Sequence, residues 1–255
     1  MMTNTRNDRP QDRLIFALDI GSGGMEEVLS WVEGLQGHVG LFKVGKEAFT
    51  IYGPALIKEI HARGARVFLD LKYHDIPNTV ARAAEGAVGL GVAMFNIHAA
   101  GGRSMMAAAA AAANQAAESL CVPAPLLIAV TVLTSLSDED LREIGFHMTA
   151  VEAVQNFARM AQDAGLAGVV ASPREIEVIR KICGEDFVIV TPGIRGSGAV
   201  AGDDQKRTLS PEEAILAGAD YLVVGRPIRM AENPVSEADR IVEAIARGLQ
   251  ARGVL

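Results

Sequence analysis

Two carboxylates and an ammonium, those of Asp70, Asp75 and Lys72, follow one another near the end of an apolar run. Successive side chains of a strand alternate between its faces, so Asp70 and Lys72 share one face and their leucine neighbours take the other. Burying charges is costly unless they are paired, and an ammonium beside carboxylates is such a pairing. The set predicts either a structural salt bridge or a functional site that holds an ammonium next to carboxylates at the tip of a strand.

These residues need a scaffold, and the chain alternates short apolar runs with longer helical patterns. The expected strands cover residues 14–19, 40–44, 66–72, 92–98, 126–133, 168–171, 187–191 and 221–225. The expected helices cover residues 25–35, 54–63, 79–90, 103–118, 149–164, 173–182, 211–217 and 235–249. This alternation predicts an α/β fold, a single-domain (β/α)8 TIM barrel. An open doubly wound sheet is the alternative, because periodicity does not separate the two.

Length and composition set further bounds. The 255 residues suit one barrel, with a disordered N-terminal tail expected over 1–12 and a catalytic domain over 13–255. Cys121 and Cys183 lie far apart and match no metal or redox spacing, which fits a reducing, cytoplasmic compartment. The net charge of −7 argues against binding to nucleic acid or anionic membranes, and no apolar run is long enough to span a bilayer.

Polar residues recur at the C-terminal ends of the expected strands, where a barrel of this kind forms its active site. Strand interiors are rich in Val, Leu, Ile and Phe, whereas the ends hold Asp19, Lys43, Asp70, Lys72, Asn96, His98, Thr134, Gly225 and Arg226. Their joint placement in one layer is the evidence for a site. No cluster of His, Cys and carboxylate residues has the spacing of a metal site, so no bound metal is expected.

Two of these strand ends suggest a phosphate site. Pro-Gly-Ile-Arg at 192–195 follows the seventh strand and Gly225-Arg226 follows the eighth, the usual phosphate position in a barrel. Glycine lets backbone N–H groups approach the anion, and arginine offers a rigid fork to its oxygens. The glycine-rich stretch 196–205 is either a lid over the site or a mobile connection.

Longer motifs surround these residues. They are Ala-Leu-Asp at 17–19, Phe-Lys-Val-Gly-Lys at 42–46, Phe-Leu-Asp-Leu-Lys-Tyr-His-Asp-Ile-Pro-Asn-Thr at 68–79, Ala-Val-Thr-Val-Leu-Thr-Ser at 129–135, Val-Thr-Pro-Gly-Ile-Arg at 190–195 and Val-Gly-Arg-Pro at 224–227. From Leu14 to about Gly248 the chain resembles the orotidine 5′-phosphate decarboxylases, in their bacterial form. A wider group of phosphosugar barrels shares the Asp-x-Lys-x-x-Asp core, and the extension through Asp-Ile-Pro-Asn-Thr is much more specific.

The resemblance implies cofactor-independent decarboxylation of orotidine 5′-phosphate (OMP) to UMP and CO2, in pyrimidine biosynthesis. It implies that Lys72 stabilises and protonates a carbanion at C6 of the pyrimidine, and that Asp70 lies beside the scissile carboxylate. Lys43 and Asp19 would hold the ribose. Asp75 would reach the active site of the partner subunit, which implies a homodimer. Lys72, Asp70, Asp75 and Lys43 form the implied catalytic set.

The resemblance also implies contacts with the rest of the substrate. The residues concerned are Thr79, Thr134 at the base, and Arg195, Gln205, Gly225 and Arg226 at the phosphate and in loop closure. The chain has one residue more before Gln205 than the common bacterial pattern. Because of this extra residue, Asp203 and Asp204 are the alternatives to Gln205 for the same position of the family pattern.

Two other functions compete with this one. Related barrels act on sugar phosphates through a metal-stabilised enediolate and place a glutamate for Mg²⁺ near the end of the second strand. This chain has Lys43 there, and an ammonium repels a divalent cation. A non-catalytic phosphate-binding barrel is the other rival, and it would tolerate loss of the acid–base set that is complete here.

Overall fold

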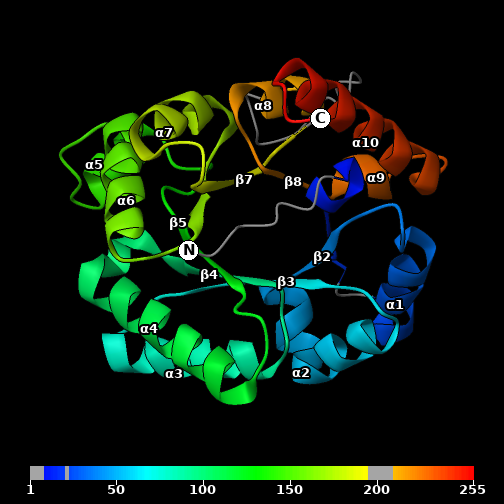
Figure 1. Ribbon diagram of the computed structural model, residues 1–255, viewed down its shortest axis with the longest axis horizontal. Helices are drawn as coiled ribbons and strands as arrows, with labels where there is room; N and C mark the ends of the chain where they lie inside the picture. Colours follow the sequence, from blue (N-terminus) through cyan, green and yellow to red (C-terminus); the bar gives the residue numbers. More distant parts are fainter. Residues whose placement is uncertain (1–8, 21–22, 195–208) are drawn as a thin grey trace.

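The computed structural model describes residues 9–20, 23–194 and 209–255. Eight parallel strands pair in sequence order, β8 closes on β1, and helices form a ring around them (Figure 1). The strands are β1 (Leu14–Ala17), β2 (Leu41–Gly45), β3 (Val67–Tyr73), β4 (Met94–His98), β5 (Leu126–Val130), β6 (Gly168–Val170), β7 (Val188–Pro192) and β8 (Tyr221–Val224). Closure confirms the predicted (β/α)8 barrel and rules out the open doubly wound sheet.

The helices of the described chain match the sequence pattern with three exceptions. They are α1 (Gly24–Leu35), α2 (Lys46–Ala62), α3 (Pro77–Gly89), α4 (Gly102–Leu120), α5 (Asp138–Glu143), α6 (Ala150–Asp163), α7 (Ile176–Cys183), α8 (Pro211–Ala217), α9 (Arg226–Arg229) and α10 (Pro234–Ala251). The first half of α2 was not expected, because Gly53, with a φ of 58°, kinks the helix just before Pro54. Neither α5 nor α9 was expected, since 6 and 4 residues are too few to show a helical period. Within the described residues, no helix is long and apolar enough to cross a membrane.

Apolar side chains pack on both faces of the strands, as a parallel sheet covered by helices requires. Leu41, Phe68 and Met94 belong to the buried cluster inside the barrel. Their strand neighbours Phe42 and Phe95 belong to the larger cluster that includes the buried faces of the helices. Burying one such side chain stabilises the fold by about 1.5–3 kcal/mol, so the two clusters hold the strand ends in place.

The chain is ordered nearer its start than we expected. The predicted tail covered 1–12, but Pro10–Arg13 form a 3-10 turn, η1, and Asp12 is buried. The Asp12 carboxylate accepts hydrogen bonds from Arg9 at 2.8 Å and from Arg66 at 3.2 Å. Pairing of this kind offsets the cost of burying a carboxylate. Residues 9–12 are therefore not part of a disordered tail, and residues 1–8 lie outside the described chain.

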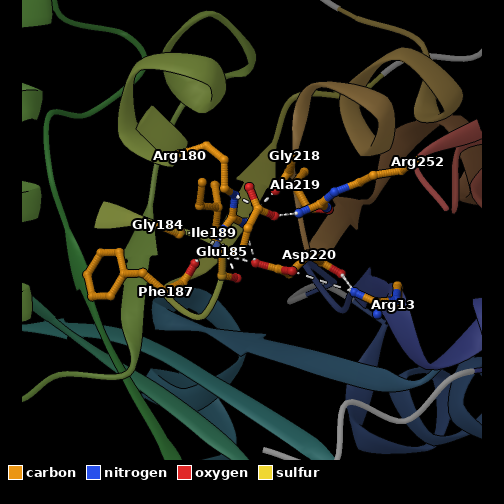
Figure 2. Close-up of polar contacts among 10 residues, drawn as sticks. All are labelled: Arg13, Arg180, Gly184, Glu185, Phe187, Ile189, Gly218, Ala219, Asp220 and Arg252. Carbon is orange, nitrogen blue, oxygen red and sulfur yellow. Dashed lines mark hydrogen bonds and ion pairs between the residues drawn. The ribbon is translucent and has the colours of Figure 1, made fainter. Parts of the chain in front are cut away.

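A buried ion network lies at the N-terminal ends of β7, β8 and β1 (Figure 2). The Arg180 guanidinium donates to the Asp220 carboxylate at 2.8 Å, and to four backbone carbonyls, those of Gly184, Glu185, Phe187 and Gly218. Asp220 also accepts from the Ile189 N–H at 2.9 Å and lies 3.6 Å from Arg13 Nη1. Two guanidinium groups thus share one buried carboxylate.

We expect Asp220→Asn to lower the free energy of unfolding by about 3–5 kcal/mol, because it removes the charge of a buried carboxylate that two buried guanidinium groups share. Urea unfolding followed by circular dichroism measures the change. Glu212→Gln is the matched control, since it removes the carboxylate of a half-exposed pair with Arg247. Such pairs contribute at most about 1 kcal/mol. Equal losses in the two variants would show that the network does not stabilise the barrel.

Candidate active site

Three polar side chains replace apolar ones at the C-terminal end of the barrel interior. Lys43, Asp70 and Asn96 are buried, and each stands two residues beyond an inward-facing residue of its strand, namely Leu41, Phe68 or Met94. Because side chains of a strand alternate between faces, all three point inward. They form one polar layer, where the sequence predicted the site.

Asp70 is the centre of this layer. Its Oδ1 accepts hydrogen bonds from Lys72 Nζ at 2.6 Å and from Asn96 Nδ2 at 2.7 Å. Its Oδ2 lies 3.4 Å from Lys43 Nζ. Each carboxylate oxygen therefore faces an ammonium, which compensates the burial of the charge.

The environment keeps Asp70 ionised. Burial alone would raise the pKa of Asp70, but the ammonium groups of Lys43 and Lys72, with hydrogen bonds from Lys72 and Asn96, bring it below its usual value. A carboxylate with a lowered pKa stabilises the fold above its unfolded pKa, and that contribution is lost as the pH falls through the folded value. The negative charge at Asp70 is thus permanent at neutral pH.

The neighbouring His98 is half-buried and lies near several cationic groups. Burial, then repulsion from His74, Lys46 and Lys72, lowers the pKa of His98 to about 4. The imidazole is therefore neutral at neutral pH, and the local charge comes from the lysines. Lysine ammonium groups gathered in this way suit an anionic substrate even in a chain with a net charge of −7.

Lys43 connects Asp70 to a more exposed carboxylate. Its Nζ donates to Asp19 Oδ1 at 2.8 Å, and the Asp19 side chain is 52% exposed. Gly45 makes room for this pair, because a Cβ there would lie 3.0 Å from Lys43 Nζ and 3.2 Å from Asp19 Oδ1. Asp19 can accept hydrogen bonds from hydroxyl groups of a ligand while Lys43 holds it.

Lys72 reaches Asp70 from an irregular stretch of strand. Its φ is 54°, in the left-handed region that residues other than glycine rarely adopt. On the adjacent strands Leu69 pairs with Phe95, whereas Tyr73 pairs with Ile97. The regular alternation assumed from the sequence therefore breaks at this point, although Asp70 and Lys72 do meet. Strained backbone of this kind concentrates at functional sites.

Comparison with known proteins identifies the family of this chain. A family model described as "Orotidine 5'-phosphate decarboxylase / HUMPS family" matches residues 12–241. The chain belongs to this family. A protein named orotidine 5′-phosphate decarboxylase from Syntrophus aciditrophicus is 62% identical over 252 residues, which cover 98% of this chain and 100% of that protein. One of the same name from Syntrophotalea carbinolica is 56% identical, with 93% of this chain and 96% of that protein covered. The crystal structure of orotidine 5′-phosphate decarboxylase from Lactobacillus acidophilus has a TM-score of 0.79 at 35% identity, covering 91% of this chain and 98% of that one.

Other residues expected from the likeness to this family follow the ends of their strands. Thr79 is exposed at the start of α3, and Thr134 is exposed beyond β5. Gly225 and Arg226 join β8 to α9, and a Cβ at Gly225 would lie 3.3 Å from the Ala17 Cβ. Arg195 and Gln205, with Asp203, Asp204 and the rest of 196–205, lie outside the described residues.

Asp75 does not join the polar layer of its own chain. It is exposed, and its Oδ1 accepts the backbone N–H of Ile76 at 2.6 Å. Among the ion pairs of the described residues, Lys72 pairs with Asp70 and Asp75 takes no part. The structure therefore brings together two members of the acid–base–acid set and leaves the third outside.

Sequence reasoning gave Asn96 no role beyond its place at a strand end. The structure puts its amide between Lys72 and Asp70. The available signal was the spacing from Met94, which predicts an inward-facing amide on the strand next to β3. Within the described residues, no three His, Cys, Asp or Glu side chains gather into a possible metal site.

Proposed function

We propose that this chain converts OMP to UMP and CO2 without a cofactor, in a single catalytic domain over 13–255. The observation that carries the proposal is Lys72 Nζ held 2.6 Å from an ionised Asp70 at the open end of the barrel. Relatives that are 62% and 56% identical bear the name of this enzyme.

The chemistry suits the residues present. Breaking the bond between C6 and the carboxylate releases CO2 and leaves an electron pair on C6. An ammonium at Lys72 stabilises that charge as it develops, since a preorganised group needs no reorganisation during the reaction. Transfer of a proton from Nζ to C6 forms the C–H bond of UMP and leaves a neutral amine, which takes a proton from water.

Asp70 and Lys43 support this step from their fixed positions. Asp70 stays ionised and holds the Lys72 ammonium in one orientation through a hydrogen bond of 2.6 Å. In the proposed complex Asp70 lies beside the scissile carboxylate. Lys43 and Asp19 hold the ribose hydroxyls through their exposed pair.

Remote contacts supply binding energy for closure of the site. Thr134 contacts the base and Thr79 the substrate, while Gly225 and Arg226 form the described part of the phosphate site. We assign Arg195 and Gln205 to the phosphate as well. Binding energy from a phosphate far from C6 is useful when it drives closure and excludes water before the chemical step.

We further propose a homodimer in which Asp75 completes the site of the partner subunit. Two features support this arrangement: the Asp75 carboxylate is exposed without an ion pair in the described chain, and the adjacent Ile76 is 65% exposed. A cytoplasmic location is proposed because Cys121 and Cys183 are both free. No contact with nucleic acid or membrane is proposed for a chain of net charge −7.

The test of this function is conversion of OMP to UMP by the purified protein, with and without EDTA. We expect turnover to be unchanged after exhaustive chelation, because Lys43 Nζ lies among the carboxylates of Asp19 and Asp70 where a divalent cation would have to bind. The loss of OMP absorbance and the release of CO2 measure the rate.

Two outcomes would contradict the proposal. Activity that disappears with EDTA and returns with Mg²⁺ would favour the metal-dependent sugar-phosphate reaction. Binding of OMP or UMP without any turnover would favour a phosphate-binding barrel.

A further inference from the structure

Asn96 makes a closed ring of contacts with Lys72 and Asp70. Its side-chain carbonyl accepts the backbone N–H of Lys72 at 2.8 Å, and its amide nitrogen donates to Asp70 Oδ1 at 2.7 Å. The same Oδ1 accepts the Lys72 ammonium at 2.6 Å. One side chain thus contacts both the backbone of the lysine and the carboxylate that orients its ammonium.

The position of this ring in the sheet explains why a side chain is needed. Between the pairs Leu69–Phe95 and Tyr73–Ile97, three residues of β3 face Asn96 alone. The ordinary ladder is interrupted there, and Lys72 turns into the left-handed region with a φ of 54°. Because β4 offers no backbone partner in regular register here, the Lys72 N–H donates to the Asn96 side-chain carbonyl instead. Buried N–H groups require such a partner.

We propose that Asn96 is a positioning residue, which fixes the left-handed turn at Lys72 and the Asp70 carboxylate in one geometry. This role serves the proposed decarboxylation of OMP, and the inference rests on that proposed function. Asn96 touches no reacting atom and acts through the two residues that it contacts.

An amide is the side chain that fits this place. The site needs an acceptor for the Lys72 N–H and a donor for Asp70 within one short side chain, and only 1% of Asn96 is exposed, so water does not readily replace either contact. Alanine supplies neither group. An ionised aspartate supplies the acceptor but places a second negative charge against Asp70.

The first experiment compares kcat and KM for OMP in wild type, Asn96→Ala and a matched control. Misplacing catalytic groups by about 1 Å costs about 100-fold in rate, so we expect Asn96→Ala to lower kcat about 100-fold and change KM less than about threefold. Thr131→Val is the control, because Thr131 is also buried at a strand end and donates to the Val170 carbonyl at 3.0 Å. It should leave both constants within about twofold.

The second experiment measures kcat against pH for Asn96→Asp. The groups around the new carboxyl are Asp70 and Lys72 on β3, Lys43 on β2, and His98, which with a pKa of about 4 stays neutral above pH 5 or so. Two adjacent carboxylates share one proton, which raises the pKa of the pair. When the introduced group is protonated it can donate to Asp70 again, so the activity of Asn96→Asp relative to wild type should rise as the pH falls.

The outcomes separate the two proposals. Wild type that does not decarboxylate OMP overturns the proposed function. Active wild type with Asn96→Ala of unchanged kcat, or with Asn96→Asp at a constant ratio across pH, overturns the positioning role. If Asn96→Ala fails to fold, the pH profile of Asn96→Asp still decides.

Discussion

Lys72→Ala is expected to lower kcat about 10⁴-fold or more, because it removes both the charge that stabilises the carbanion and the proton that quenches it. The fold should persist, since Asp70 keeps its contacts with Lys43 and Asn96. Steady-state kinetics measure the loss, and circular dichroism confirms that the variant is folded.

Lys72→Arg separates the two roles of the lysine. A guanidinium keeps a positive charge near Asp70 but does not give up its proton at any pH that proteins tolerate. We expect this variant to be almost as inactive as Lys72→Ala. Lys181→Ala, which removes an exposed ammonium from α7, should behave as wild type. Near-normal turnover in Lys72→Ala or in Lys72→Arg would rule out the proton-donor assignment.

Mixing inactive Asp75→Asn subunits with inactive Lys72→Ala subunits is expected to restore activity. If each site takes Asp75 from the partner subunit, a mixed dimer has one native site and one site with both changes. With random exchange of equal amounts, about half of the dimers are mixed, so about a quarter of all sites are native. Activity against the mixing ratio measures this fraction.

The control is native mass spectrometry, which shows that subunits have exchanged. A site confined to one chain predicts no recovery at any ratio. Exchange without recovered activity would therefore place Asp75 outside the partner's site.

The strands were predictable because their physical signal is local. The β-strands are short runs rich in apolar residues, and the closed barrel has strands at all eight expected places. Helix boundaries were harder where a helix was short or interrupted. The capping box of Ser137 and Asp140 does mark α5 in the sequence, but Gly53-Pro54 concealed the first half of α2.

The site was predictable only where side chains alternate regularly between the two faces of a strand. Lys43 and Asp70 lie where alternation places them, two residues beyond apolar neighbours that face the interior. The left-handed backbone at Lys72 has no signal in the residue types, because it depends on how β3 pairs with β4. For the same reason, the role of Asn96 required the coordinates of both strands.

Arg180 and Asp220 pair beside the N-terminal ends of β7 and β8 (Figure 2). Asp70 lies toward the C-terminal end of β3, at the other end of the barrel. The buried ion network and the polar layer therefore consist of different residues at opposite ends of the strands. Substitutions that change substrate specificity at the C-terminal ends of the strands leave the Arg180–Asp220 network intact, so they retain its contribution to the free energy of unfolding. New loops grafted after the C-terminal ends of the strands would leave the buried network at the N-terminal ends intact. Natural changes in specificity can likewise occur in these loops without altering the network.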